Sequence, residues 1–195
     1  MNLLVALDGE DITVIDDGSD YNFKLHARRC NYIRTKHRGK QGYWITFLLM
    51  FNLARDMTYC DEYIFIPDDI TDFDIYRLRV DAQKYRNHLF AINILNINRG
   101  TPANWGVPIE HGYIDCAFYT NRRTLSKLQF KMAPIPERRF KDNPNISSGV
   151  GRQLTRRMHR LGIEMIIPDR SYAVHGNHPS VMNPSERIIN PQITR

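Results

Sequence analysis

The stretch Tyr63-Ile64-Phe65-Ile66-Pro67-Asp68-Asp69 carries the strongest single indication of the fold and of a site. Its aromatic and β-branched residues are typical of a short buried strand, and the proline that follows cannot continue a strand ladder. Two adjacent carboxylates at the end of a core strand repel each other, and a divalent metal ion is the usual partner that offsets this repulsion. An acidic turn that caps the next helix is the alternative interpretation, because aspartate is common in turns.

A second strand with an acidic end comes earlier in the chain. The β-branched run Asp11–Ile15 predicts a strand, and Asp16-Asp17-Gly18-Ser19-Asp20 follows it as an abrupt acidic turn. In an open α/β sheet, ligands bind outside the carboxyl ends of the strands. If the two strands are parallel neighbours, both acidic pairs face one crevice, which favours a binding site over two unrelated turns.

A basic loop with glycines lies between these two strands in the sequence. Tyr32–Arg34 predicts a short strand, and Thr35–Gly42 leads from it into a helix predicted over Tyr43–Arg55. Glycines let backbone N–H groups approach an anion, and a helix N-terminus favours negative charge. The loop therefore predicts an anion site, with a solvated basic loop as the alternative. The Walker spacing GxxxxGK[ST] does not occur here.

The second half continues the alternation of strands and helices, which predicts an α/β architecture. It includes an arginine-rich helix, whose alternative interpretation is a solvated face, and a late glycine-containing segment with His175 and His178. Neutral imidazoles suit a metal or phosphate contact, although histidines in loops are often merely polar. The remaining predicted elements are helix 74–87, strand 89–95, strand 111–119, helix 120–128, a mobile crossing loop over 134–145, a basic helix that ends at 161 and strand 164–168.

The composition fits one globular domain. The chain has 195 residues, 42% of them hydrophobic, and 27 Lys and Arg against 21 Asp and Glu give a net charge of +6. This excess favours an anionic partner, such as a nucleotide, a phosphorylated substrate, nucleic acid or an acidic membrane surface, without choosing among them. We expect one domain over residues 1–180 and a polar tail over 181–195.

Cysteine usage and hydropathy predict a cytoplasmic protein. The three cysteines Cys30, Cys60 and Cys116 are far apart and form no CxxC pair, so neither a disulfide framework nor a zinc site is expected. The longest apolar run, Trp44–Leu53, is too short to span a membrane. The first residues lack the positive region of a signal peptide, so we expect no secretory leader and no transmembrane segment.

Five blocks of this sequence, taken in order, resemble the family-2-like glycosyltransferases of the GT-A fold. Ile12–Ser19 resembles the nucleotide-binding strand end of that family, and Tyr63–Asp69 resembles the strand that leads to its metal-binding DxD-type motif. The resemblance implies a single-domain GT-A-like (Rossmann-like) mixed sheet flanked by helices. The other three blocks are Gly39–Gly42 with Asn52, Gly149–Gln153 with Arg156, Arg157 and Gly162, and Tyr172–Gly176.

The resemblance also implies an activity, which is transfer of a sugar from a nucleoside-diphosphate sugar, most simply a UDP-sugar, with Mn²⁺ or Mg²⁺. Asp16 and Asp17 would hold the base and ribose of the donor. Asp69, assisted by Asp68, would bind the metal ion that bridges the diphosphate, and His175 would complete the metal or phosphate shell. A hard cation shared by carboxylates and phosphates makes the diphosphate a better leaving group, which agrees with these roles.

Three further basic residues, Lys36, Arg38 and Lys40, would add positive charge near the phosphates. The chain departs from the family in that Met1–Leu7 resembles the tail of the helix that follows the family's usual first strand. It departs again at Gly149-Val150-Gly151, where inverting members place a Glu-Asp pair that supplies the general base. We rank Asp115 first as a replacement, and a retaining mechanism, which needs no such base, stays open. The other candidate bases are Glu110, Glu137 and Asp142.

Two alternatives to a transferase of neutral acceptors remain. The departures and the arginine-rich helix favour a non-catalytic module that binds nucleotide or nucleic acid on a degenerate GT-A scaffold. The same basic balance favours a transferase whose acceptor is itself anionic, such as modified DNA or a phosphorylated polymer.

Overall fold

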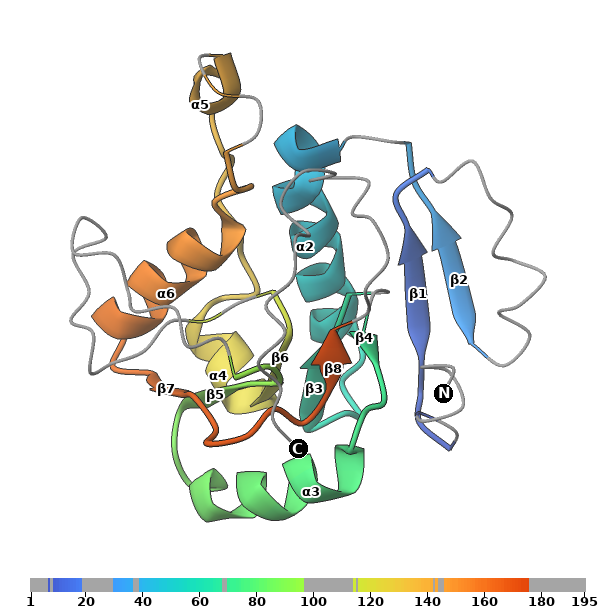
Figure 1. Ribbon diagram of the computed structural model, residues 1–195, viewed down its shortest axis with the longest axis vertical. Coiled ribbons are helices and arrows are strands. Elements are labelled where there is room, and N and C mark those ends of the chain that lie inside the picture. Colours follow the sequence, from blue (N-terminus) through green and yellow to red (C-terminus); the bar gives the residue numbers. More distant parts are fainter. Residues whose placement is uncertain are drawn as a thin grey trace.

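The computed structural model shows a mixed α/β fold with one four-stranded sheet, two sheets of two strands each and, within the described part of the chain, five α-helices (Figure 1). All structural statements below concern the residues that the structure describes. These are residues 7, 9–18, 30–36, 39–67, 70–96, 114, 116–141, 143 and 146–175, with only the backbone of Thr71 and His175.

The central sheet is built from four short strands. Its order is β3 (Glu62–Phe65), β6 (Phe118–Asn121), β5 (Phe90–Asn93) and β7 (Glu164–Ile166). β6 is antiparallel to both of its neighbours, whereas β5 and β7 are parallel, so the sheet is mixed as expected. All four residues of β5 are buried, which explains why its first three residues are apolar in succession rather than alternating with polar ones.

Helices and loops cover both faces of this sheet. Successive residues of a strand point to opposite faces, and Phe118 accordingly joins one apolar cluster while Tyr119 joins the other. The first cluster lies beneath α2 (Gly39–Asp56), α4 (Arg122–Lys127) and α6 (Val150–Arg160). The second lies beneath α3 (Ile75–Ala82).

Stacked phenylalanines form the centre of the first cluster. The rings of Phe65 and Phe118 have centroids 4.8 Å apart, and Phe47 of α2 stacks on Phe118 at 6.4 Å. Phe47 and Phe118 are both completely buried. A cluster of this kind fixes α2 against the sheet, because each aromatic ring removes a large apolar surface from water.

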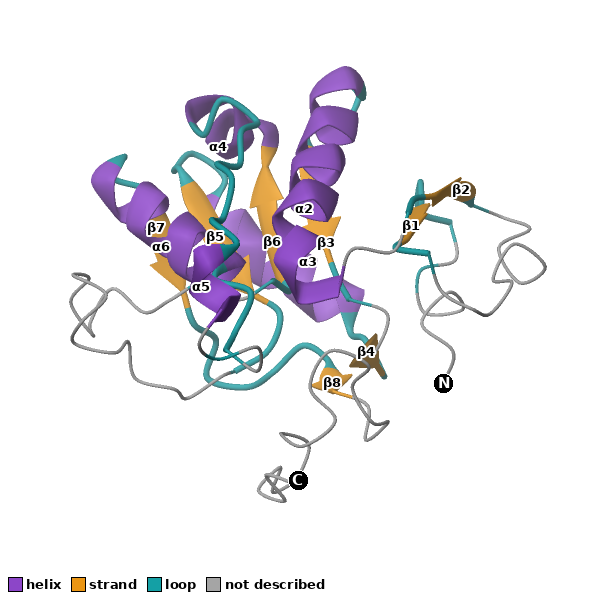
Figure 2. Cartoon of the chain, turned by 90° about the horizontal axis from the view of Figure 1, so that it is seen from above, coloured by secondary structure: helices purple, strands orange, loops and turns teal. Residues whose placement is uncertain are grey.

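A separate pair of strands lies beside the central sheet. β1 (Thr13–Asp16) and β2 (Asn31–Arg34) pair in parallel, and Figure 2 shows them apart from β3. The two acidic strands are therefore not ladder neighbours within the described residues, and the condition for one shared crevice is not met there. β1 gives one edge to β2 and β3 gives one edge to β6, and the facing edges of β1 and β3 are separated by a cavity lined by both strands.

The remaining elements are short. β4 (Ile70–Thr71) and β8 (Val174–His175) form an antiparallel pair, and a 3₁₀ turn, η2 (Gln83–Tyr85), follows α3. A further helix, α5 (Arg138–Lys141), lies inside the segment predicted as a crossing loop. The boundaries of the predicted elements also shift.

The shifts have local causes. α2 begins at Gly39 rather than at Tyr43, because Gly39 takes a positive φ of 55° that turns the basic loop directly into the helix. α4 begins at Arg122 because the side chain of Asn121 caps it, accepting a hydrogen bond from the N–H of Thr124 at 2.8 Å. The helix predicted over 74–87 is capped by the Asp74 side chain, which accepts a hydrogen bond from the N–H of Arg77, and it gives way to the 3₁₀ turn after Ala82.

Candidate functional site

Asp16 ends β1 as a buried carboxylate, with only 5% of the residue exposed. The Tyr32 hydroxyl of β2 donates a hydrogen bond to its Oδ2, and the Arg34 Nε lies 3.7 Å from the same oxygen. The Asp16 carbonyl accepts the N–H of Thr35 at 2.7 Å. A buried charge is stable only when it is paired and hydrogen-bonded, so these contacts hold the carboxylate in place at the end of the strand.

The hydrogen bond to Asp16 also changes the pKa of its donor, the Tyr32 hydroxyl. The pKa of Tyr32 is raised above its usual value of 10.0, first because its proton is engaged by the Asp16 carboxylate. The Asp16 carboxylate lies at the carboxyl end of β1, and carboxylate oxygens accept hydrogen bonds from hydroxyl groups. Asp16 can therefore both stabilise the β1–β2 pair and contact a hydroxyl-bearing ligand.

Asp17 follows directly and is half-buried. Its Oδ1 accepts a hydrogen bond from the Thr35 hydroxyl at 3.2 Å. Gly18 then turns the chain with φ of 72°, a conformation that an L side chain rarely adopts. The turn directs the chain away from the strand and leaves the two carboxylates at the carboxyl end of β1.

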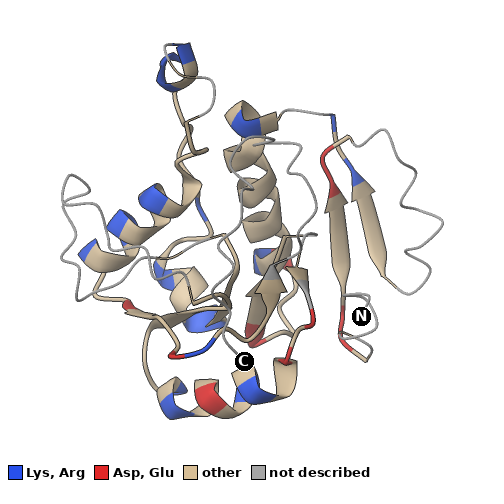
Figure 3. Ribbon diagram, in the orientation of Figure 1, with Lys and Arg blue, Asp and Glu red and all other residues tan. Residues whose placement is uncertain are grey.

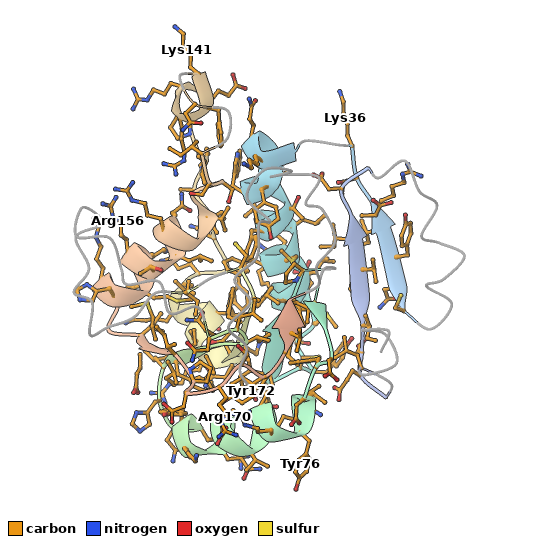
Figure 4. The ribbon with its side chains drawn as sticks, viewed as in Figure 1. Lys36, Tyr76, Lys141, Arg156, Arg170 and Tyr172 are labelled. Atoms are coloured by element: carbon orange, nitrogen blue, oxygen red, sulfur yellow. The ribbon has the colours of Figure 1, made fainter. Side chains whose placement is uncertain are left out.

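The basic loop ends at the same side of the molecule. α2 starts at the end where β1 and β2 finish (Figure 1), and Lys40 lies in its first turn, which contains no acidic residue. The partial positive charge of a helix N-terminus adds to the lysine there. Lys36 extends from the end of β2 away from the body of the protein (Figure 4), and Arg38 lies outside the described residues.

The predicted metal residues are described only in part. Asp68 and Asp69 lie outside the described residues, and of His175 only the backbone is described. The residues next to them in the sequence are described and form a ladder. Ile70 pairs with His175 and Thr71 with Val174 in the β4–β8 ladder, so the strand that begins directly after the two aspartates runs against the strand that carries the histidine.

The same segment supports the turn interpretation as well. The N–H of Ile70 lies 3.4 Å from the carbonyl of Pro67, so the residues on either side of the acidic pair are close together. Ile70 itself is buried with 1% exposure, which anchors the end of the turn. Within the described part of the chain, no group of three His, Cys, Asp or Glu residues could hold a metal ion. The metal site stays a prediction.

The predicted general base, like most of the predicted metal residues, is not described by the structure. Asp115, Glu110 and Asp142 lie outside the described residues, and Glu137 is exposed just before α5. The N–H of Ile114 donates to the buried Thr155 hydroxyl of α6 at 3.0 Å, so the chain next to Asp115 is attached to the basic helix.

The arginines in and beside α6 differ in what they contact. Arg157 donates to the carbonyls of Leu128 and Lys131, at 2.6 and 2.5 Å, and burial lowers its pKa. It is a structural residue that ties α6 to the loop after α4. Sequence reasoning grouped it with the basic face, because no local pattern shows which carbonyls it meets.

Three other arginines gather at the start of α6, and we call Arg139, Arg152 and Arg156 the arginine cluster. Burial lowers the pKa of Arg152, and the charges of Arg156 and Arg139 lower it further. Arg139 packs on Gly149, where an added Cβ would come within 3.0 Å of its Nε. Lys and Arg positions recur along α5 and α6 in Figure 3, and the Arg156 side chain projects outward from α6 in Figure 4. A clustered positive charge of this kind attracts an anion.

A cavity that sequence reasoning missed lies between β1, α2 and β3. Its volume is about 210 Å³, and Ile12, Ile15, Met50, Leu53 and Ile64 contribute apolar walls. None of Asp16, Asp17 and Lys40 lines it. The cavity is therefore distinct from the predicted nucleotide site.

Searches of protein-family models, of curated proteins and of solved structures found no match to this chain. None of the helices in the described ranges is long and apolar enough to cross a membrane.

Proposed function

We propose that this chain is a metal-dependent glycosyltransferase that moves a sugar from a nucleoside-diphosphate sugar to an acceptor. The observation that carries the proposal is the β4–β8 ladder, in which Ile70 is the cross-strand partner of His175. Asp69 directly precedes Ile70 in the sequence, so the strand that follows one predicted metal residue pairs with the strand that contains another, more than 100 positions later. Nothing in the local sequence requires this pairing.

The donor nucleotide would contact the carboxyl end of β1. Asp16 is already fixed there by Tyr32, and Asp17 by Thr35, so both carboxylates are oriented before a ligand arrives. Oriented acceptors bind ribose or base donors without a further ordering cost. Lys40 and the N-terminus of α2 would attract the diphosphate from the same end of the molecule.

The metal ion would be held by Asp69, Asp68 and His175. Adjacent carboxylates fit a hard divalent cation such as Mn²⁺ or Mg²⁺, which usually keeps several waters and shares phosphate oxygens. When bound, the cation would neutralise charge on the departing diphosphate. In an inverting reaction Asp115 would take the proton of the acceptor hydroxyl, whereas a retaining reaction would not need it for that step.

Release of UDP from UDP-sugars in the presence of Mn²⁺ tests the proposal. The Asp69→Ala variant should lose at least 100-fold of the metal-dependent turnover, and His175→Ala should lose less, because one imidazole is a smaller part of the shell. Asp169→Ala is the matched control, since Asp169 is an exposed aspartate outside the predicted site. Undiminished turnover in Asp69→Ala, with unchanged thermal unfolding, would rule out the metal assignment.

A second candidate is a module that binds nucleic acid without catalysis, and the arginine cluster favours it. Its affinity for DNA should fall steeply with salt, because binding releases counterions from the phosphates. The double variant Arg152→Gln/Arg156→Gln should flatten the salt dependence by about two phosphate contacts. DNA binding combined with sugar turnover on a DNA acceptor would instead identify a transferase with an anionic acceptor.

A further inference from the structure

We propose that the cavity between β1 and β3 receives an extended apolar strand from a second polypeptide, which pairs with both strand edges and joins the two sheets. The proposal is independent of the transferase activity. It follows from the shape of the cavity, from the direction of the backbone groups at its two edges, and from the charges at its rim.

The cavity is large enough to receive a ligand. Its volume of about 210 Å³ compares with about 10–15 Å³ for the space that one water molecule needs by the same measure. Its walls come from two strands and a helix that are far apart in sequence, with Ile12 and Ile15 on one side, Ile64 and Ile66 on the other, and Met50 and Leu53 of α2.

The β1 edge of the cavity carries backbone groups that have no ladder partner among the described residues. The carbonyls of Ile12 and Asp16 accept hydrogen bonds from the N–H groups of Asn31 and Thr35, at 2.8 and 2.7 Å. Backbone groups alternate in direction along a strand, so those of Thr13 and Ile15 point away from β2. Both of these residues line the cavity, and no described residue forms a ladder with this edge.

The edge of β3 across the cavity carries a matching set of backbone N–H and C=O groups. The N–H of Arg122 donates to the carbonyl of Asp61 at 2.8 Å, which fixes the alternation on the β6 side. The backbone groups of Tyr63 and Phe65 consequently point to β6, and those of Glu62 and Ile64 point to the cavity. Within the described ranges, β3 has β6 as its single ladder partner.

Two open edges beside an apolar cavity favour a strand as the occupant. Buried N–H and C=O groups without partners cost free energy, and an exposed strand edge is a template for pairing. A small apolar molecule would fill the volume but leave both edges unpaired. An inserted strand would satisfy both and would make β2, β1 and the central sheet continuous, in the manner of strand addition by peptide-binding domains.

The rim charges define the chemistry of that strand. Among the described lining residues, Glu10, Asp11 and Glu62 face one cation, Arg79, which already donates two hydrogen bonds of 2.7 and 2.8 Å to Glu10. The excess of carboxylates selects an occupant with basic residues beside its apolar core. The partner segment is therefore about five β-branched residues flanked by lysine or arginine.

Amide hydrogen exchange of the full chain with a synthetic peptide tests the proposal. The probe is acetyl-Lys-Val-Thr-Val-Ile-Val-Lys-amide, and its control replaces Thr and Ile by proline, which preserves charge but removes the N–H donors of one edge, so the control cannot pair with both strands. Saturating probe should slow exchange of the Thr13, Ile15, Glu62 and Ile64 amides at least tenfold. The amides of Val14 and Tyr63, which already face β2 and β6, should change less.

Several results would overturn the proposal. Unchanged exchange would exclude strand pairing, and equal slowing by the proline peptide would show apolar binding without a ladder. Amides that are protected without peptide, and that lose protection when residues 1–6 are deleted, would identify the chain's own first residues as the occupant. Protection that grows with protein concentration in the absence of peptide would identify a second copy of this chain instead.

Discussion

The central sheet and the β1–β2 pair are both built from short strands, yet they are held in different ways. β5 is buried along its whole length and stacked aromatic rings cover the sheet, whereas β2 has exposed residues at both ends. In the β1–β2 pair the tightest contacts are polar, from Tyr32 and Arg34 to Asp16. Apolar packing fixes the scaffold, and oriented polar groups fix the surface that would meet a ligand.

The largest expected effect is a loss of unfolding free energy, and it should differ between the two regions because they depend differently on apolar packing. Phe118→Ala should cost about 3–5 kcal/mol of unfolding free energy, because it empties the completely buried centre of the aromatic cluster. Ile15→Ala in the half-buried β1 should cost less than half as much. Urea unfolding of both variants measures the difference, and equal losses would contradict the comparison.

A smaller effect is expected where polar contacts support the scaffold itself. Arg122 donates to the carbonyls of Ala54 and Met57 and to the Tyr63 hydroxyl, at 3.1, 3.0 and 2.6 Å. Arg122→Met keeps most of the side chain's length but removes these three charge-assisted hydrogen bonds, which should cost about 1–3 kcal/mol. Arg123→Met, on the same helix and exposed, serves as the control in the same unfolding experiment.

Some of these elements could be predicted from the sequence, whereas their pairing could not. The runs at β3 and β5 are apolar enough to predict strands, and the alternation of elements predicts an α/β fold. The partner of β1 could not be predicted, because strand pairing depends on which edges meet in three dimensions. The ladder between Ile70 and His175 joins two-residue strands, which are too short to leave any periodicity.

The candidate site likewise has features that the local sequence shows and features that depend on distant elements. Paired aspartates after strands are visible in the sequence, and Asp16 indeed ends β1. The structural role of Arg157 depends on carbonyls at Leu128 and Lys131, and the cavity depends on three elements meeting. Neither feature has a local pattern, so composition placed Arg157 in the basic face and gave no sign of the cavity.

A local effect is expected in the β1–β2 pair. Asp16→Asn removes the charge that faces Arg34 and weakens the acceptor for Tyr32. Hydrogen exchange of the amides in β1 and β2 should speed up several-fold, while that in β5 and β6 stays unchanged, because local openings need not involve the core. Faster exchange throughout the chain would show that the pair and the central sheet unfold together.

The smallest effect concerns the contacts beneath β8. The Tyr172 hydroxyl donates to Asp81 at 2.9 Å, and the pKa of Asp81 is lowered, first by its hydrogen bond with Lys84 and then by that with Tyr172. A depressed carboxyl pKa stabilises the fold above the unfolded value of 3.8, and this stabilisation is lost as the pH falls through the folded pKa.

Tyr172→Phe should therefore raise the Asp81 pKa part of the way toward 3.8 and reduce the loss of stability in acid. Titration of the Asp81 carboxyl carbon by NMR measures the shift. An unchanged Asp81 pKa would mean that Lys84 and Arg77 set it without a contribution from Tyr172.

Paramagnetic broadening by Mn²⁺ is the most direct test of the metal site. Mn²⁺ and UDP are added to the isotope-labelled chain, and the amide signals of Ile70, Thr71, Val174 and His175 are followed, since these residues form the β4–β8 ladder. We expect these signals to broaden strongly, to recover on chelation, and to stay sharp in Asp69→Ala. Sharp β4 and β8 signals in the unaltered chain, or broadening centred on the arginine cluster, would contradict the account.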